Sequence, residues 1–243
     1  MGRHARIAQL ARLDEPGLHV ADLGCGNGRT VRQLLAYEPA VVHALDQVSD
    51  LDDDLLHDPR VTSRIVDLDE DLLLPTGSLD RVVSLNAVEH LADPVAHLTE
   101  VHRVLRPGGI LVLAHSDWDT ALFTSTDDAL TRRLVDRFVA TVPTWVERAD
   151  GFMGRKLPAL ADASAERGAP FSVVHLDAWA DPHRRFDEGS LAFKVAMGIL
   201  AASADDPELA PLGAGWLTGL ANLAAGDQFL FTVTDVALVL RRA

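Results

Sequence analysis

This chain has a single cysteine, no long apolar run and no excess of positive charge. Its 243 residues include one cysteine, Cys25, which excludes an internal disulfide and a multi-cysteine metal site. No run of 18 apolar residues occurs, so we expect no membrane-spanning helix, and residues 1–12 lack the pattern of a signal peptide. The net charge of −14 disfavours a nucleic-acid partner, because phosphates repel an acidic surface. These absences predict a cytoplasmic protein without nucleic-acid or membrane partners.

What the chain does have is a hydrophobic fraction of 48% and a regular alternation of strand and helix patterns. Five apolar runs are typical of buried parallel strands, at 19–23, 41–45, 63–68, 81–85 and 110–114. Helical patterns separate them, including a short acidic one at 49–57. Another begins at Asp93-Pro94, an aspartate N-cap followed by proline at the first helical position. This alternation predicts an α/β fold with helices on both faces of a parallel sheet.

The most informative segment lies at the end of the first strand and reads Asp22-Leu23-Gly24-Cys25-Gly26-Asn27-Gly28. A dinucleotide-binding loop requires G-x-G-x-x-G, but Arg29 stands where its third glycine should be. Glycines allow positive φ angles and close approach of a ligand, and the helix that follows points free N–H groups at that ligand. We therefore expect a ligand-binding loop that is not of the dinucleotide type.

A polar residue stands at the carboxyl end of each of the next three predicted strands. Ligands bind at this edge in sheets of this kind. Asp46 follows the second strand, where its carboxylate is suited to accept hydrogen bonds from both hydroxyls of a ribose. Asp67-Leu68 ends the third strand, where Asp67 is suited to an adenine amino group and Asp69 is a competitor for that role. Asn86 ends the fourth strand and is expected to face the ligand.

Four segments occur in the order typical of one enzyme family: the glycine loop at 22–28, LPTGSLD at 74–80, EHL at 89–91 and RVLRPGG at 103–109. Together they resemble the class I S-adenosylmethionine-dependent methyltransferases, in the small-molecule branch that includes ubiquinone and menaquinone methyltransferases. The resemblance implies a Rossmann-like, doubly wound sheet of seven strands with the last antiparallel, and S-adenosyl-L-methionine as cofactor. It implies that the cofactor-binding residues are Asp22, Gly24, Gly26, Gly28, Asp46, Gln47, Asp67, Leu68 and Asn86.

The rest of the chain is expected to complete a single class I domain over 1–243. Its core is predicted at about 18–117, 170–177 and 228–241, with the sixth strand near 171–176 and the seventh near 229–240. Two helical insertions, at about 118–168 and 178–226, are expected to form a cap over the acceptor. Related enzymes usually carry longer N-terminal helices over the cofactor, so the lid is expected to be short or to come from elsewhere. Arg3, His4 and Arg6 are candidates to reach the cofactor carboxylate.

Methyl transfer from a sulfonium requires positioning, exclusion of water and, for some acceptors, a base. His115 and His90 are candidate catalytic bases because each follows a strand, and a local structural role for His90 is an equally good interpretation. His97 and His102 are expected to be solvated. The candidate acceptor contacts are His115, Asp117, Trp118 and Arg155.

The sequence thus predicts a methyltransferase that acts on an O, N or C atom of a small molecule, with specialised metabolism as a hypothesis. No metal site is predicted, since the acidic run at 50–54 is typical of a solvated helix face. We expect a monomer or a homodimer. Two alternatives stay open: a nicotinamide-dependent oxidoreductase, which the glycine spacing disfavours, and a non-catalytic cofactor-binding protein on the same fold.

Overall fold

The computed structural model of this protein describes residues 2–48, 50–141 and 147–243, and the chain divides into two compact units. The first unit contains the residues up to His115 together with Arg155–Ala178 and Val236–Ala243. The second unit contains Ser116–Gly154 and Trp179–Asp235. Three long strands contribute residues to both units, namely β5 (Leu105–Phe123), β6 (Phe171–Ala180) and β7 (Phe231–Arg242).

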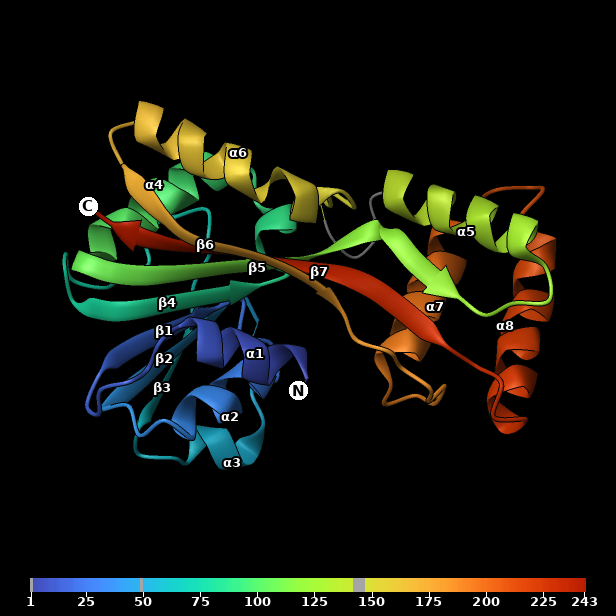
Figure 1. The fold of residues 1–243 in the computed structure, drawn as a ribbon, viewed down its shortest axis with the longest axis horizontal. Coiled ribbons are helices and arrows are strands. Elements are labelled where there is room, and N and C mark those ends of the chain that lie inside the picture. Colours follow the sequence, from blue (N-terminus) through green and yellow to red (C-terminus); the bar gives the residue numbers. More distant parts are fainter. Residues whose placement is uncertain (1, 49, 142–146) are drawn as a thin grey trace. The chain divides into compact units, whose positions relative to one another are not determined.

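The sheet has seven strands in the order β3-β2-β1-β4-β5-β7-β6 (Figure 1). Its first four strands are β1 (His19–Leu23), β2 (Val41–Asp46), β3 (Val61–Ile65) and β4 (Leu79–Leu85). The pairs β1–β2, β1–β4, β2–β3 and β4–β5 are all parallel. Only β7 runs in the opposite direction, as Figure 1 shows. The predicted seven-stranded, Rossmann-like sheet with an antiparallel last strand is therefore confirmed.

Helices cover both faces of the sheet in the first unit, as Figure 1 shows for α1 and α2 on one side and α4 and α6 on the other. These helices and two shorter ones are α1 (Arg3–Leu10), α2 (Arg29–Leu35), α3 (Asp53–Leu56), a 3₁₀ turn at Val88–His90, α4 (Pro94–Val104) and α6 (Met153–Glu166). The sequence signal for α4 is confirmed, because the Asp93 carboxylate accepts hydrogen bonds from the N–H groups of Val95 and Ala96. The strands between these layers are apolar and buried, as in β1, where four of five residues are buried.

The second unit has its own apolar core around three helices, α5 (Asp128–Ala140), α7 (Leu191–Ala202) and α8 (Ala210–Ala225). Phe123 and Trp216 pack edge to face at the centre of this core, with ring centroids 5.4 Å apart. The Trp216 indole N–H donates a hydrogen bond of 2.9 Å to Thr131, which satisfies its one buried polar group. We expected a helical cap over the acceptor from this part of the sequence, and that role stays a prediction.

Three predicted boundaries were wrong. Strand β5 extends far beyond 110–114, because the polar residues that follow continue as a buried strand: Ser116 Oγ donates a hydrogen bond of 2.7 Å to Asp235. Strand β3 covers Val61–Ile65 rather than 63–68. Helix α3 covers four residues rather than 49–57, of which residue 49 lies outside the described part. Among the described residues, no helix has both the length and the apolar character needed to cross a bilayer.

Candidate functional site

The glycine loop follows β1 and turns the chain sharply into α2. Its three glycines all have positive φ angles, of 76° at Gly24, 49° at Gly26 and 87° at Gly28, a region that side chains other than glycine rarely adopt. The Gly24 N–H donates a hydrogen bond of 2.8 Å to the carbonyl of Leu45, which fixes the start of the loop against β2. The backbone conformation of the loop therefore requires glycine at these positions, as the sequence predicted.

The three glycines differ in what surrounds them. A Cβ atom on Gly24 would lie 2.5 Å from Cβ of Ala87, and one on Gly28 would collide with the side chains of Leu51 and Leu55. A Cβ on Gly26 would meet no atom within 4 Å. Two glycines are therefore required by packing within the protein, whereas Gly26 leaves open space at the surface of the loop.

Asp46 ties the end of β2 to the glycine loop. Its Oδ2 accepts a hydrogen bond of 2.8 Å from the backbone N–H of Gly26, and its Oδ1 accepts one of 3.3 Å from Val48. Each carboxylate oxygen can accept about two hydrogen bonds, so the group retains capacity for a ligand. Asp46 thus lies at the predicted position and also orders the loop.

Asp22 lies beneath the loop at the end of β1, with only 1% of its surface exposed. Within the described residues, its Oδ2 is buried without a hydrogen-bond partner. Burial, and secondarily the charge of Asp46, raises the pKa of Asp22 to about 7. Burial also raises the pKa of the Cys25 thiol to about 12, so this residue is an unreactive thiol at neutral pH. A buried carboxyl group with one oxygen left without a partner at this place favours a positively charged ligand nearby.

A cavity of about 140 Å³ opens beside the loop at the carboxyl ends of the strands. It gathers six of the nine predicted cofactor residues, with His90 and three further residues: Gly24, Asp46, Gln47, Asp67, Leu68, Asn86, His90, Asp69, Ala87 and Leu91. Among these described lining residues are three aspartates and neither lysine nor arginine. The cavity is therefore strongly acidic.

The two competing aspartates after β3 have different surroundings. Asp69 accepts hydrogen bonds from the N–H groups of Ala92, at 2.8 and 3.0 Å, and Asp93, at 3.3 Å. Asp67 is exposed and accepts a hydrogen bond of 3.0 Å from the N–H of Asp69. Because Asp69 is occupied in joining two loops, Asp67 is the better placed of the two for a ligand.

Asn86 follows β4 in a left-handed conformation, with a φ of 55°. Its N–H donates a hydrogen bond of 3.0 Å to the carbonyl of Ala114 in β5, which holds this conformation in place. Asparagine tolerates the left-handed region better than most residues, and such outliers gather at functional sites. Its place at the cavity agrees with the position predicted for it.

Both candidate bases lie close to the carboxylate of Glu89. Oε1 of Glu89 is 3.4 Å from Nε2 of His90 and 3.5 Å from Nε2 of His115. The His90 side chain is 35% exposed and lines the cavity, whereas His115 is fully buried and does not. The roles expected of His115 as a base and as a substrate contact stay predictions, and His90 is the candidate base that lines the cavity.

The remaining acceptor candidates fall in different units. Asp117 and Trp118 belong to the second unit, where Asp117 is buried and the Trp118 N–H donates a hydrogen bond of 2.9 Å to Gly151. Arg155 belongs to the first unit and is an exposed residue of α6. Their role as acceptor contacts stays a prediction.

The burial of His97 was not predicted from the sequence. We expected a solvated side chain, but it is 3% exposed, and its Nδ1 donates a hydrogen bond of 2.8 Å to the carbonyl of Leu68. Burial lowers the pKa of His97, so the neutral ring holds the backbone of a cavity residue in place. His97 is four residues before Val101, on the apolar stripe of α4, and this spacing could have revealed it. His102 is likewise only half-exposed.

The comparisons with known proteins agree with this geometry. Residues 21–113 match the family model described as a methyltransferase domain. A 37.1 kDa protein of transposon TN4556 from Streptomyces fradiae, described as uncharacterized, is 31% identical over 226 residues, which are 88% of this chain and 63% of that protein. The ubiquinone biosynthesis O-methyltransferase of Xanthomonas oryzae pv. oryzae is 33% identical over 118 residues, 46% of this chain and 49% of that protein.

The solved structures extend the likeness in fold to nearly the whole chain. The S-adenosylmethionine-dependent methyltransferase of Mesorhizobium loti has a TM-score of 0.54 and 21% identity, and the match covers 98% of both chains. The chain spans less than two thirds of the length of the curated relatives named above. Residues 21–113 thus match a methyltransferase domain, and the resemblance to class I S-adenosylmethionine-dependent methyltransferases is confirmed.

Proposed function

We propose that this protein transfers a methyl group from S-adenosylmethionine to a small-molecule acceptor. The observation that carries the proposal is the acidic cavity beside the glycine loop, where Asp46 and Asp67 lie at the carboxyl ends of adjacent strands. The cofactor carries a positive sulfonium and an ammonium group, both of which an acidic site attracts. Asp22 adds a buried acid beneath the same loop.

The residues present fit the parts of this cofactor. Asp46 would accept hydrogen bonds from the ribose hydroxyls, and Asp67 with the backbone of Leu68 would hold the adenine. The open face of Gly26 would admit the methionine portion, and Asn86 lines the cavity beside the loop. A volume of about 140 Å³ is below the roughly 300 Å³ of a pocket that encloses a whole ligand. The cavity therefore accommodates part of the cofactor, and the glycine loop would contact the rest.

When bound, the cofactor supplies an activated methyl group, so this chain's task is to orient the acceptor and exclude water. His90 lines the cavity, and its Nε2 lies 3.4 Å from Oε1 of Glu89. His90 would take a proton from an acceptor hydroxyl or amine, and an acceptor carbon with no proton to lose would not need it.

The acidic cavity also separates this proposal from a nicotinamide-dependent oxidoreductase. A dinucleotide carries a pyrophosphate against the glycine loop, where this chain presents Asp46 and the buried Asp22. The negative charge of Asp46 at that position would repel a pyrophosphate. The spacing of the glycines and the charge of the site therefore both disfavour a nicotinamide dinucleotide as the ligand.

The test is calorimetric titration of the purified protein with S-adenosylmethionine, S-adenosylhomocysteine and NADH. We expect micromolar binding of the first two and no binding of NADH. A folded sample that binds neither sulfur compound would overturn the proposal. Transfer of a labelled methyl group to any member of a panel of phenols, amines and carbon acids would then establish catalysis. Cofactor binding without turnover on the whole panel would favour the non-catalytic alternative.

A further inference from the structure

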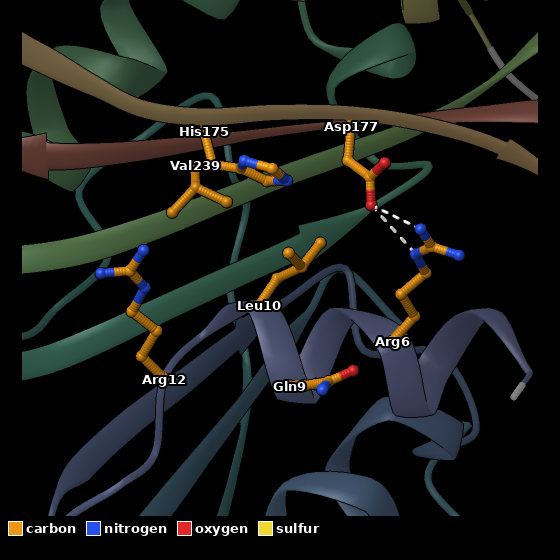
Figure 2. A pocket seen from close by; sticks show the side chains of 7 residues that line it. All are labelled: Arg6, Gln9, Leu10, Arg12, His175, Asp177 and Val239. Atoms are coloured by element: carbon orange, nitrogen blue, oxygen red, sulfur yellow. Dashed lines mark hydrogen bonds and ion pairs between the residues drawn. The ribbon is translucent and has the colours of Figure 1, made fainter.

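A second cavity in the first unit shares no lining residue with the cavity beside the glycine loop. Its volume is about 380 Å³, within the range of small-molecule sites. As Figure 2 shows, it lies between α1 and the strands β6 and β7. It is lined by Arg6, Gln9, Leu10, Arg12, His175, Asp177 and Val239.

Arg12 is held in an unusual backbone conformation at one end of this cavity. Its φ is 52°, in the left-handed region where glycine is the favoured residue at the end of a helix. The Arg81 guanidinium fixes this conformation, since its Nε donates a hydrogen bond of 2.8 Å to the carbonyl of Ala11 and its Nη2 donates one of 3.2 Å to that of Arg12. A residue other than glycine in this conformation lowers the stability of the fold, and such strained residues are concentrated at functional sites.

The guanidinium of Arg12 is also available for a ligand. The residue is exposed, and no carboxylate of the described residues 2–48, 50–141 and 147–243 forms an ion pair with it. At the other end of the cavity, Arg6 donates hydrogen bonds of 3.0 and 2.8 Å to one oxygen of Asp177. This pair is neutral overall, so Arg12 makes the cavity net positive in a protein whose total charge is −14.

The wall between the two ends is apolar. Leu10 projects from α1 into the cavity, and Val239 of β7 faces it across the space in Figure 2. His175 lies two residues before Asp177 in β6, so both side chains are on the same face of the strand. The cavity thus offers a cation beside an apolar surface, with an imidazole within the same lining.

We propose that this cavity binds a small organic anion whose carboxylate pairs with Arg12 and whose short apolar body lies over Leu10 and Val239. A guanidinium is a planar fork that binds a carboxylate through two parallel hydrogen bonds. The apolar wall contributes burial of the attached hydrocarbon, which a free inorganic anion does not have. The site does not depend on the proposed methyl transfer, because none of its residues lines the cavity beside the glycine loop.

The test is calorimetric or NMR titration of the full chain with hexanoate, 1-hexanol and inorganic phosphate, without any cofactor. We expect the protein to bind hexanoate at least about tenfold more tightly than either hexanol or phosphate, since only hexanoate has both features. The Arg12→Gly variant should lose at least about tenfold in hexanoate affinity. It should keep or raise the melting temperature, because glycine suits the left-handed conformation.

Two further variants complete the design. Arg12→Lys keeps the charge but loses the fork and should bind hexanoate with intermediate affinity. Arg185→Ala removes one positive charge from a residue of the second unit whose side chain is 83% exposed, and should bind as the wild type does. Absence of hexanoate binding to the folded wild type, equal binding of hexanol, or wild-type affinity in Arg12→Gly would each overturn the proposal.

Discussion

Asp46 and Gly26 are joined across the candidate site, where the carboxylate at the end of β2 accepts a hydrogen bond of 2.8 Å from the loop's central glycine. This contact gives one residue two tasks. The carboxylate orders the loop in the free protein, and its remaining capacity faces the cavity. Loss of Asp46 should therefore weaken cofactor binding both directly and through a less ordered loop.

We expect Asp46→Ala to bind S-adenosylhomocysteine at least about tenfold more weakly, since a hydrogen bond to a charged group contributes about 1.5–3 kcal/mol. Calorimetric titration measures the change. The matched control is Asp54→Ala, which removes an exposed acid of α3 that pairs with Arg32 and lines no part of the cavity. If both variants bind alike, the role assigned to Asp46 is wrong.

The different surroundings of two glycines predict different effects of the same substitution. Gly28→Ala should lower the melting temperature, because its Cβ would collide with Leu51 and Leu55 at a φ of 87°. Gly26→Ala should cost only about 1 kcal/mol of stability, from its positive φ, because its Cβ meets open space. That Cβ should nevertheless lower cofactor affinity by occupying the ligand's path. Thermal unfolding and titration of both variants separate the two effects, and full cofactor affinity in Gly26→Ala would contradict the placement of the ligand.

The raised pKa of Asp22 predicts an unusual dependence of the free energy of unfolding on pH. Its pKa is raised to about 7 in the folded protein, from an ordinary value of 3.8 in the unfolded chain. Between these two values the folded state binds the extra proton, so the free energy of unfolding falls as pH rises from about 4 to about 7. The slope from this one group approaches about 1.4 kcal/mol per pH unit.

In the Asp22→Asn variant, the free energy of unfolding should lack this contribution to its pH dependence. Urea unfolding of the wild type and the variant from pH 4.5 to pH 8 gives a difference profile in which other groups cancel. We expect the variant to gain stability relative to the wild type as pH rises. A difference that does not change with pH would show that Asp22 is not the titrating group.

The site residues that the sequence predicted are those at strand ends. Asp46, Asp67 and Asn86 are distant in sequence, but their strands are parallel neighbours or near neighbours, so their carboxyl ends meet at one edge of the sheet. Gly24 lines the same cavity because β1 lies in the middle of this group. Alternation of strands and helices was therefore sufficient to place them together.

The errors concern residues whose partners are distant. Ser116 lies beyond the predicted end of the fifth strand at residue 114, yet it continues β5 and is buried through a hydrogen bond to Asp235, 119 positions further along. His97 was read as solvated, yet its partner is the carbonyl of Leu68. A local pattern shows that a side chain is polar, but not that a distant segment will satisfy it.

His4 attaches α1 to the start of α2, next to the glycine loop. Its Nδ1 lies 2.9 Å from Oγ1 of Thr30, and the pKa of His4 is lowered to about 4 by burial first and then by the charges of Arg3 and Arg29. The unfolded chain has the ordinary value of 6.5, so below that pH it binds the proton more readily than the folded protein does. The stabilising contribution of neutral His4 is therefore present above pH 6.5 and is lost as pH falls toward about 4.

This loss should appear as local opening of α1 in acid. We expect the amides of α1 to exchange with solvent faster at pH 5 than at pH 7.5, after correction for the intrinsic pH dependence of exchange. In His4→Gln, which cannot be protonated, protection should be the same at both pH values. Asp22 opposes this trend in global stability over the same pH range, so a local readout on α1 is needed to isolate it. Equal pH dependence in wild type and His4→Gln would show that another group controls the attachment of this helix.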